Sequence, residues 1–204
     1  MIAIIDYGVG NLFSLASSFS AIGAEAVVTS DPAVIRAADR IILPGVGAFE
    51  DAARKLRESG MADLVKEEAA RGKPIMGICL GMQMLFERSF EYGEHEGLGL
   101  IKGSIRPIAD VIGEGLKIPH IGWNALHFGD KKDELFKYIN EGDCVYFVHS
   151  YYGAECDESV IATAEYGAEL TAAVRHGNVC GVQFHPEKSE RVGLAILRAF
   201  CEIN

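Results

Sequence analysis

Short apolar segments alternate with helical segments through the first 86 residues, and this alternation constrains the fold more than any other feature. Buried strands are predicted at 2–6, 24–29, 40–43 and 74–78. Apolar residues at helical spacing predict helices over about 12–22, 48–58, 61–71 and 80–86. Because strands joined through helices run parallel and are covered on both faces, the pattern predicts a parallel sheet between two helical layers.

The second half of the chain changes to strands with short connections. They are predicted at 101–107, 117–126, 144–151, 160–166, 170–175 and 179–183, with a hairpin turn at 176–178. A last helix carries apolar residues at helical spacing from Val192 to Phe200 and is expected to dock on the sheet. We therefore expect an α/β fold: a parallel-core open sheet flanked by helices with an antiparallel extension, forming one domain over 1–204.

Charge and hydropathy exclude two classes of partner. The net charge of -10 repels phosphate backbones, which argues against nucleic acid. Apolar runs fall short of the ~18 residues that a membrane helix needs. The N-terminus lacks the basic and small-residue features of a secretion signal, so we expect a cytoplasmic protein without membrane contact.

The cysteines are five in number and widely spaced. An odd count argues against a disulfide framework, and the absence of a C-x-x-C pair argues against a zinc site. Cys144, Cys156, Cys180 and Cys201 are interpreted as small apolar core residues in a reducing cytosol.

Cys79 differs because it lies in Gly77-Ile78-Cys79-Leu80-Gly81, where a buried strand is predicted to turn into a helix. This is the setting of a nucleophile elbow, with Cys in place of Ser. Small neighbours let strand and helix pass closely, and backbone N–H groups after the turn can hold an oxyanion. The alternative is a buried structural cysteine beside two packing glycines.

His185 and Glu187 follow directly on a predicted strand. Pro186 biases His185 toward an extended conformation, in which residues two apart point the same way. Glu187 can then set the imidazole tautomer while His185 accepts a thiol proton. A surface turn is the alternative for this triplet alone, but its occurrence together with an elbow cysteine favours a catalytic set.

Two glycine loops follow strands in the first half. Pro44-Gly45-Val46-Gly47 is interpreted as a loop that turns a backbone N–H toward an oxyanion, with an ordinary strand-to-helix turn as the alternative. Gly8-Val9-Gly10 is not a dinucleotide fingerprint, because position 13 is Phe, and Asn11 is interpreted as a helix N-cap. His149, inside an apolar strand, is interpreted as a core or wall residue.

The Cys79 elbow, the Pro44–Gly47 loop and the His185-Pro186-Glu187 triplet together resemble the class I (triad) glutamine amidotransferases. The similarity covers nearly the whole chain. It includes the opening stretch 4–12 and the stretches 122–124, 146–151 and 183–189.

The resemblance implies that Cys79 attacks the side-chain amide of L-glutamine, with His185 and Glu187 completing the triad. It implies residue roles by position: oxyanion donors near Val46 and Leu80, glutamine contacts at Gly47, Gln83, Ser150 and Tyr151, and a partner-facing surface at Asn11, Trp123, Tyr146 and Lys188. The implied partner is a (β/α)8-barrel cyclase that receives the ammonia in a heterodimer. No metal or organic cofactor is implied.

Two alternatives use the same residues differently. A self-sufficient cysteine hydrolase would keep the triad and need no partner. A binding module would keep the fold with an inert Cys79, although such a module would not need an intact Cys-His-Glu set.

Overall fold

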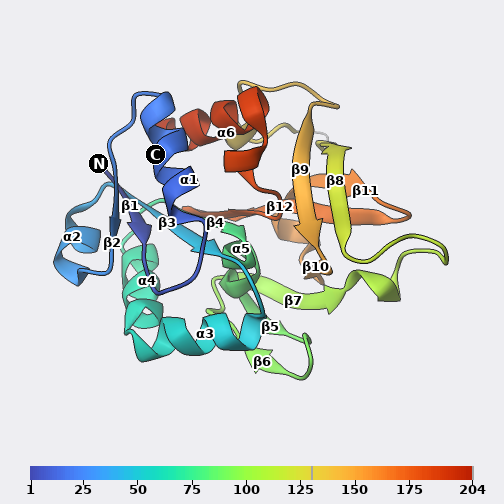
Figure 1. The fold of residues 1–204 in the computed structure, drawn as a ribbon, viewed down its shortest axis with the longest axis horizontal. Helices are drawn as coiled ribbons and strands as arrows, with labels where there is room; N and C mark the ends of the chain where they lie inside the picture. The colour runs from blue at the N-terminus through green and yellow to red at the C-terminus, as the bar shows by residue number, and fades with distance from the viewer. Residues whose placement is uncertain (130, 204) are drawn as a thin grey trace.

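The computed structural model describes residues 1–129 and 131–203. Its centre is a seven-stranded sheet in the order β11-β12-β13-β4-β3-β1-β2 (Figure 1). Five neighbouring strands are parallel, and β12 and β11 add an antiparallel edge. Their bounds are β1 Ile2–Ile5, β2 Ala26–Thr29, β3 Arg40–Gly45, β4 Ile75–Cys79, β11 Val160–Glu165, β12 Glu169–His176 and β13 Val179–Val182.

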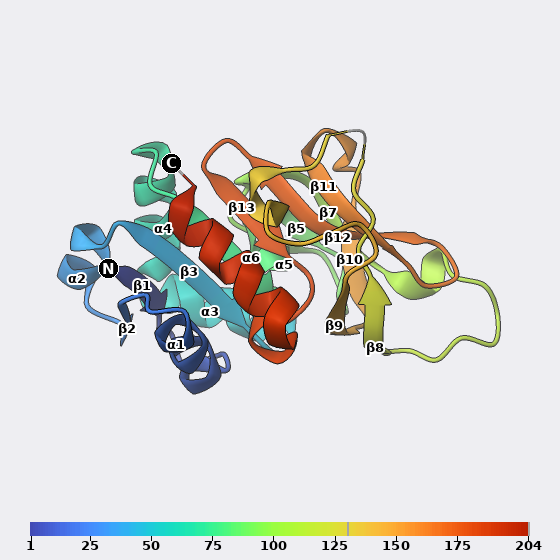
Figure 2. The same cartoon turned by 90° about the horizontal axis from the view of Figure 1, so that it is seen from above.

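Helices cover both faces of this sheet (Figure 2). One face carries α1 (Leu12–Ala21) and α6 (Glu190–Glu202), and the other carries α2 (Pro32–Ala37), α3 (Phe49–Glu58), α4 (Met61–Ala70) and α5 (Leu80–Leu85). Strand β1 shows why: Ile2 and Ile4 join the apolar cluster under α1 and α6, while Ala3 and Ile5 join the opposite one. Alternate side chains of a strand point to opposite faces, so a strand apolar throughout is buried on both sides.

Two smaller sheets accompany the seven-stranded one. The first has the order β10-β7-β5-β6, with β5 Phe86–Ser89, β6 His95–Glu96, β7 Ile101–Pro107 and β10 Tyr151–Ala154. The second pairs β8 (His120–Ala125) with β9 (Cys144–His149) in antiparallel register. Short 3-10 turns lie at Ile108–Asp110, Glu134–Phe136, Asp157–Ser159 and Pro186–Lys188.

The predicted α/β fold with a parallel core and an antiparallel extension is confirmed, but several elements differ. The single strand expected at 144–151 is broken at Ser150, because β9 and β10 belong to different sheets. The strand expected to begin at 117 begins at His120, after a cis peptide bond between Ile118 and Pro119.

Helix α2 was not predicted, although the sequence contains two signals for the start of a helix there. Asp31 accepts a hydrogen bond from Ala33 N at 2.8 Å, and Pro32 occupies the first turn. Both are ordinary signals for the beginning of a helix. Among the described residues, every helix is too short or too polar to cross a membrane.

Candidate active site

Cys79 ends β4 in a backbone conformation that is uncommon for a side-chain-bearing residue. Its φ is 54° and its ψ is -113°, and α5 begins at the next residue. Positive φ costs free energy and persists only where the surroundings impose it. The sharp turn expected of a nucleophile elbow is therefore present in the backbone.

Glycines make this turn sterically feasible. A Cβ at Gly81 would overlap the carbonyl oxygen of Leu43, and one at Gly77 would lie 2.6 Å from the carbonyl oxygen of Gly81. A Cβ at Gly45, on neighbouring β3, would lie 2.7 Å from the backbone nitrogen of Gly81. Three backbone segments thus meet around Cys79 at distances that any side chain would prevent.

The sulfur of Cys79 faces a cavity of about 500 Å³. Its Sγ lies 3.8 Å from Gln183 Nε2, which donates toward it, and 4.0 Å from the carbonyl oxygen of Val148. The residue is 8% exposed, so a ligand in the cavity can reach Cys79 while bulk water has little access.

His185 also lines this cavity, and Glu187 lies behind it. His185 Nδ1–H donates to Glu187 Oε1 at 2.8 Å, and the side chains are 4% and 1% exposed. This hydrogen bond fixes the ring and leaves Nε2 for the Cys79 side, as in other nucleophile–base–orienter sets. The second oxygen of Glu187 is buried without a partner among the described residues.

The protonation of His185 is governed by its neighbours. Burial acts to lower its pKa, but hydrogen bonding and charge attraction from Cys79 and Glu187 outweigh burial and raise the pKa above its ordinary value. The arrangement therefore favours a protonated imidazole beside the Cys79 sulfur. Such a pair can attack a carbonyl carbon and then protonate a departing amine.

The glycine loop after β3 lines the same cavity as His185. Val46 is 43% exposed, and Gly47 has a φ of 94°. Tyr7 Oη donates to the carbonyl oxygen of Pro44 at 2.7 Å, which ties the loop to the end of β1. Burial, followed by the charge of nearby Cys79, raises the pKa of Tyr7, so its hydroxyl stays protonated and donates.

All residues predicted to contact glutamine or its oxyanion line the one cavity beside Cys79. They are Val46, Gly47, Leu80, Gln83, Ser150 and Tyr151. Two hydrogen bonds fix the side chain of Gln83: its Nε2 donates to Gln183 Oε1 at 3.0 Å and to the carbonyl oxygen of Tyr151 at 3.3 Å.

Sequence reasoning missed other parts of the cavity wall. Glu91, Tyr92, Ile118, Pro119 and Val148 line it without forming a motif. His149, interpreted as a core or wall residue, lines it as well. Gln183, which follows β13 and contacts Cys79 and Gln83, was given no role, because its contacts are with residues far away in the sequence.

The residues predicted to face a partner are brought together in part. Trp123 and Tyr146 pair across β8 and β9 with ring centroids 6.0 Å apart, and Lys188 Nζ lies 5.7 Å from the Tyr146 ring centroid. Asn11 stands apart from this cluster, just before α1, which contacts the Pro186–Lys188 turn. It occupies the N-cap position of α1 as expected, although its side chain makes no capping hydrogen bond.

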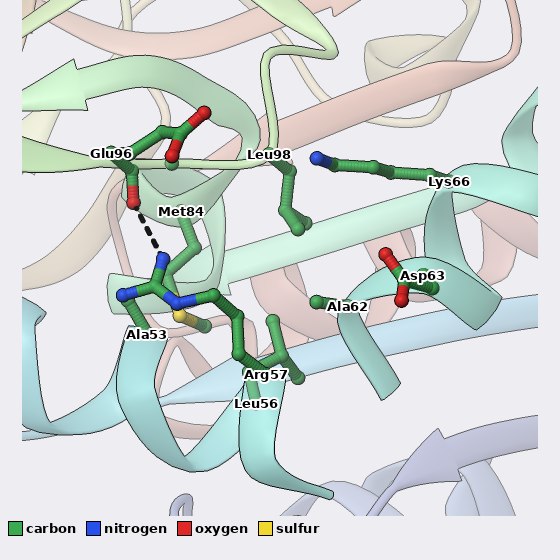
Figure 3. A pocket seen from close by; sticks show the side chains of 10 residues that line it. Ala53, Leu56, Arg57, Ala62, Asp63, Lys66, Met84, Glu96 and Leu98 are labelled. Carbon is green, nitrogen blue, oxygen red and sulfur yellow. Dashed lines mark hydrogen bonds between the residues drawn. The ribbon is translucent and has the colours of Figure 1, made fainter. Parts of the chain in front are cut away.

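A second hollow lies between α3, α4 and β6, away from Cys79 (Figure 3). Its volume is about 70 Å³, and its Arg57 donates to the carbonyl oxygen of Glu96 at 3.1 Å. Its lining contains no Cys, His or Ser side chain, so it lacks the nucleophile and base of the first cavity. Over 1–129 and 131–203, no three His, Cys, Asp or Glu side chains are grouped as metal ligands would be.

Comparisons with known proteins agree with this arrangement. The family model "Glutamine amidotransferase class-I" matches residues 3–203. Imidazole glycerol phosphate synthase subunits HisH of Wolinella succinogenes and Sulfurimonas denitrificans are 48% and 51% identical to this chain. The first alignment covers 100% of both chains, and the second covers 98% of this chain and 97% of the relative.

Solved structures share the fold at low sequence identity. A glutamine amidotransferase crystal structure has a TM-score of 0.77 at 20% identity, covering 99% of this chain and 98% of that one. PurLQS from Thermotoga maritima has a TM-score of 0.72 at 22% identity, covering 98% and 97%. The chain belongs to the class I glutamine amidotransferases, and among them to the family of imidazole glycerol phosphate synthase HisH subunits.

Proposed function

We propose that this chain is the glutaminase subunit of an imidazole glycerol phosphate synthase. It hydrolyses L-glutamine to L-glutamate and ammonia, and the ammonia is used by a second subunit in histidine biosynthesis. The observation that carries the proposal is the cavity in which Cys79, an imidazole held by a buried carboxylate, and the predicted glutamine contacts meet.

The proposed reaction proceeds through a thioester on Cys79. The Cys79 thiolate attacks the side-chain carbonyl carbon of glutamine, and the resulting oxyanion is held by backbone N–H groups near Val46 and Leu80. The C–N bond breaks as His185 passes its proton to the departing ammonia. His185 then accepts a proton from water, which attacks the thioester carbonyl, releases glutamate and restores the thiolate.

Glutamine binding falls to the other cavity residues in this proposal. Gly47, Gln83, Ser150 and Tyr151 surround the position next to the sulfur where the substrate has to lie. The fixed Gln83 amide offers its remaining oxygen to the ligand, since both of its N–H groups are already directed at carbonyl oxygens.

The relatives are named as subunits, which supports a partner for this chain as well. We propose that the partner is a (β/α)8-barrel cyclase, and that the heterodimer forms imidazole glycerol phosphate and an aminoimidazole carboxamide ribonucleotide in the cytoplasm. Ammonia in neutral water is rapidly protonated and ceases to be a nucleophile, so a closed route between the subunits preserves it.

The docking surface proposed for the cyclase comprises Asn11, Trp123, Tyr146 and Lys188. Trp123 is 47% exposed although it is among the largest apolar side chains, and exposed aromatic residues are typical of interface centres. All 204 residues serve as one amidotransferase domain in this proposal.

We further propose that docking activates the glutaminase. The Val46–Gly47 segment is exposed and contains a glycine at positive φ, so its peptide can turn its N–H toward or away from the oxyanion at low conformational cost. The isolated subunit is then nearly inactive, and the partner favours the productive orientation.

The test is glutamate release by the purified chain, alone and with a barrel cyclase plus its ribonucleotide. We expect a large rise when both are added, abolished by Cys79→Ala and retained by Cys201→Ala, which removes a half-buried cysteine on α6. High activity of the isolated chain would instead identify an independent hydrolase. Unchanged activity in Cys79→Ala would reject the proposed nucleophile.

A further inference from the structure

Gln183 is a buried polar residue that contacts two residues of the cavity wall, Cys79 and Gln83. It follows directly on β13, and its side chain is fully buried. Its backbone nitrogen donates to the carbonyl oxygen of Ala172 at 2.8 Å, so the main chain is fixed by the neighbouring strand. On one side its amide contacts the Cys79 sulfur, and on the other it contacts Gln83.

The hydrogen bonds determine which way this amide points. The Nε2 of Gln83 directs its N–H groups at two acceptors, the carbonyl oxygen of Tyr151 and the Oε1 of Gln183. Reversing Gln183 would bring two NH₂ groups together and place a carbonyl oxygen against the sulfur. The observed orientation is therefore favoured by the contact with Gln83, and it leaves Gln183 Nε2–H aimed at Cys79.

A donor at this position acts on the charged form of the cysteine. A hydrogen bond to a buried thiolate is charge-assisted, whereas one to the neutral thiol is weak. Water has little access to the sulfur, so few other donors compete. The same N–H contacts the sulfur when the thiolate attacks and again when it departs from the thioester.

We propose that Gln183 is a further catalytic residue, whose side-chain amide donates to the Cys79 thiolate while its carbonyl oxygen holds Gln83 in place for glutamine. The part of this inference that concerns Gln83 rests on the proposed function. The part that concerns Cys79 involves the sulfur alone and can be measured without substrate or partner.

The first test is the pH dependence of Cys79 alkylation by iodoacetamide, followed by mass analysis of the peptide that contains Cys79. In Gln183→Met the donor is lost at similar volume. We expect the midpoint of the alkylation profile to move up by about one pH unit, which makes labelling on the acidic side of the midpoint roughly tenfold slower. An unmoved midpoint would overturn the proposal.

Thr171→Val is the matched control. Thr171 is a buried hydroxyl residue whose Oγ1 lies 3.9 Å from the sulfur of another buried cysteine, Cys156. Its replacement removes a comparable polar contact without touching Cys79, so the Cys79 profile should stay in place. A shift of equal size in this control would assign the effect to general loosening of the core and overturn the proposal.

A second variant, Gln183→Glu, keeps the proposal testable if Gln183→Met folds poorly. Gln183→Glu keeps the shape and sets a carboxyl group beside the sulfur, so the alkylation midpoint should rise above that of the wild type, and an unchanged or lowered midpoint would contradict the proposal. Wild-type chain that alkylates at Cys79 with the expected profile but never hydrolyses glutamine would reject the glutaminase function while leaving the Gln183–Cys79 contact intact.

Discussion

Tyr7 joins two loops whose backbones meet beside Cys79. Its hydroxyl donates to the carbonyl oxygen of Pro44. A Cβ at Gly10 would lie 3.0 Å from the Pro44 side chain, so the loop before α1 packs directly on the loop that carries Val46. At the residue scale, this one hydrogen bond positions the start of the proposed oxyanion loop.

Replacing Tyr7 by Phe should leave the fold intact and slow glutamine hydrolysis. The buried carbonyl of Pro44 loses its donor, which costs about 1–3 kcal/mol in unfolding free energy. A displaced oxyanion donor lowers kcat by about tenfold or more. Steady-state glutaminase kinetics of the complex and urea unfolding measure the two effects.

Tyr138→Phe is the control for Tyr7→Phe. The Tyr138 hydroxyl donates to Glu202 at 2.6 Å on the surface, so its loss should alter neither quantity measurably. Wild-type kcat in Tyr7→Phe would show that the Tyr7–Pro44 hydrogen bond does not position the loop.

The sequence indicated Cys79, His185 and Glu187 because their signals are local. An elbow needs small residues two positions either side of the nucleophile, and a His-x-Glu triplet in extended chain converges on one point. Gln183 and Tyr7 were not indicated, because their contacts join segments far apart in the sequence. Only the register of β13 against β4 brings Gln183 to the sulfur.

At the element scale, the site depends on how closely β3, β4 and α5 approach one another. Gly45, Gly77 and Gly81 come from these three elements, and each occupies a place where a Cβ would meet backbone atoms. Backbone atoms cannot move aside as a side chain can, so these three positions leave no room for a Cβ atom.

Gly81→Ala should destabilise the protein by about 2 kcal/mol or more, since overpacking against backbone forces the elbow apart. Gly113→Ala is the matched control, because a Cβ there would have nothing within 4 Å. The midpoint of urea unfolding should fall in the first variant only. Equal midpoints for both variants would contradict the close approach described at the elbow.

The two-stranded β8–β9 sheet contains a pair of buried histidines, His120 and His149. His149 Nε2 lies 3.0 Å from His120 Nδ1, while His149 Nδ1 donates to the carbonyl oxygen of Tyr151 at 2.8 Å. His120 stacks on Phe147 and Tyr166, with ring centroids 5.1 Å and 4.0 Å away. Burial is the main cause that lowers the pKa of His149 from 6.5 to about 4, and the hydrogen bond to Tyr151 opposes it.

Acid should therefore weaken the folded state through His149. Its pKa is lower in the folded than in the unfolded chain, so its contribution is complete above pH 6.5 and is lost as the pH falls toward 4. The loss approaches about 3 kcal/mol. Urea unfolding at several pH values should give a shallower acid slope for His149→Gln than for the wild type, and identical slopes would contradict the assignment.

Element boundaries were predictable where apolar periodicity was long, as in α3, α4 and the central strands. The second half was predicted as a set of strands, but its division into separate sheets was not. Strand pairing depends on contacts between distant segments, and the break at Ser150 is set by the change of sheet from β9 to β10.

For the whole molecule, the proposed partner surface and the candidate active site share one structural element. Trp123 and Tyr146 lie on the two-stranded β8–β9 sheet, and Val148 and His149, on the same sheet, line the cavity beside Cys79. A partner bound on Trp123 therefore contacts an element that reaches the cavity within a few residues. This arrangement supports a glutaminase whose activity depends on its partner.

The proposed thioester on Cys79 can be trapped by acid-quenching the complex during glutamine turnover and measuring the mass of the peptide that contains Cys79. We expect an added glutamyl group on Cys79 in the wild type, and no adduct and no turnover in Cys79→Ala. Continued glutamine hydrolysis by Cys79→Ala, or an adduct confined to another residue, would contradict it.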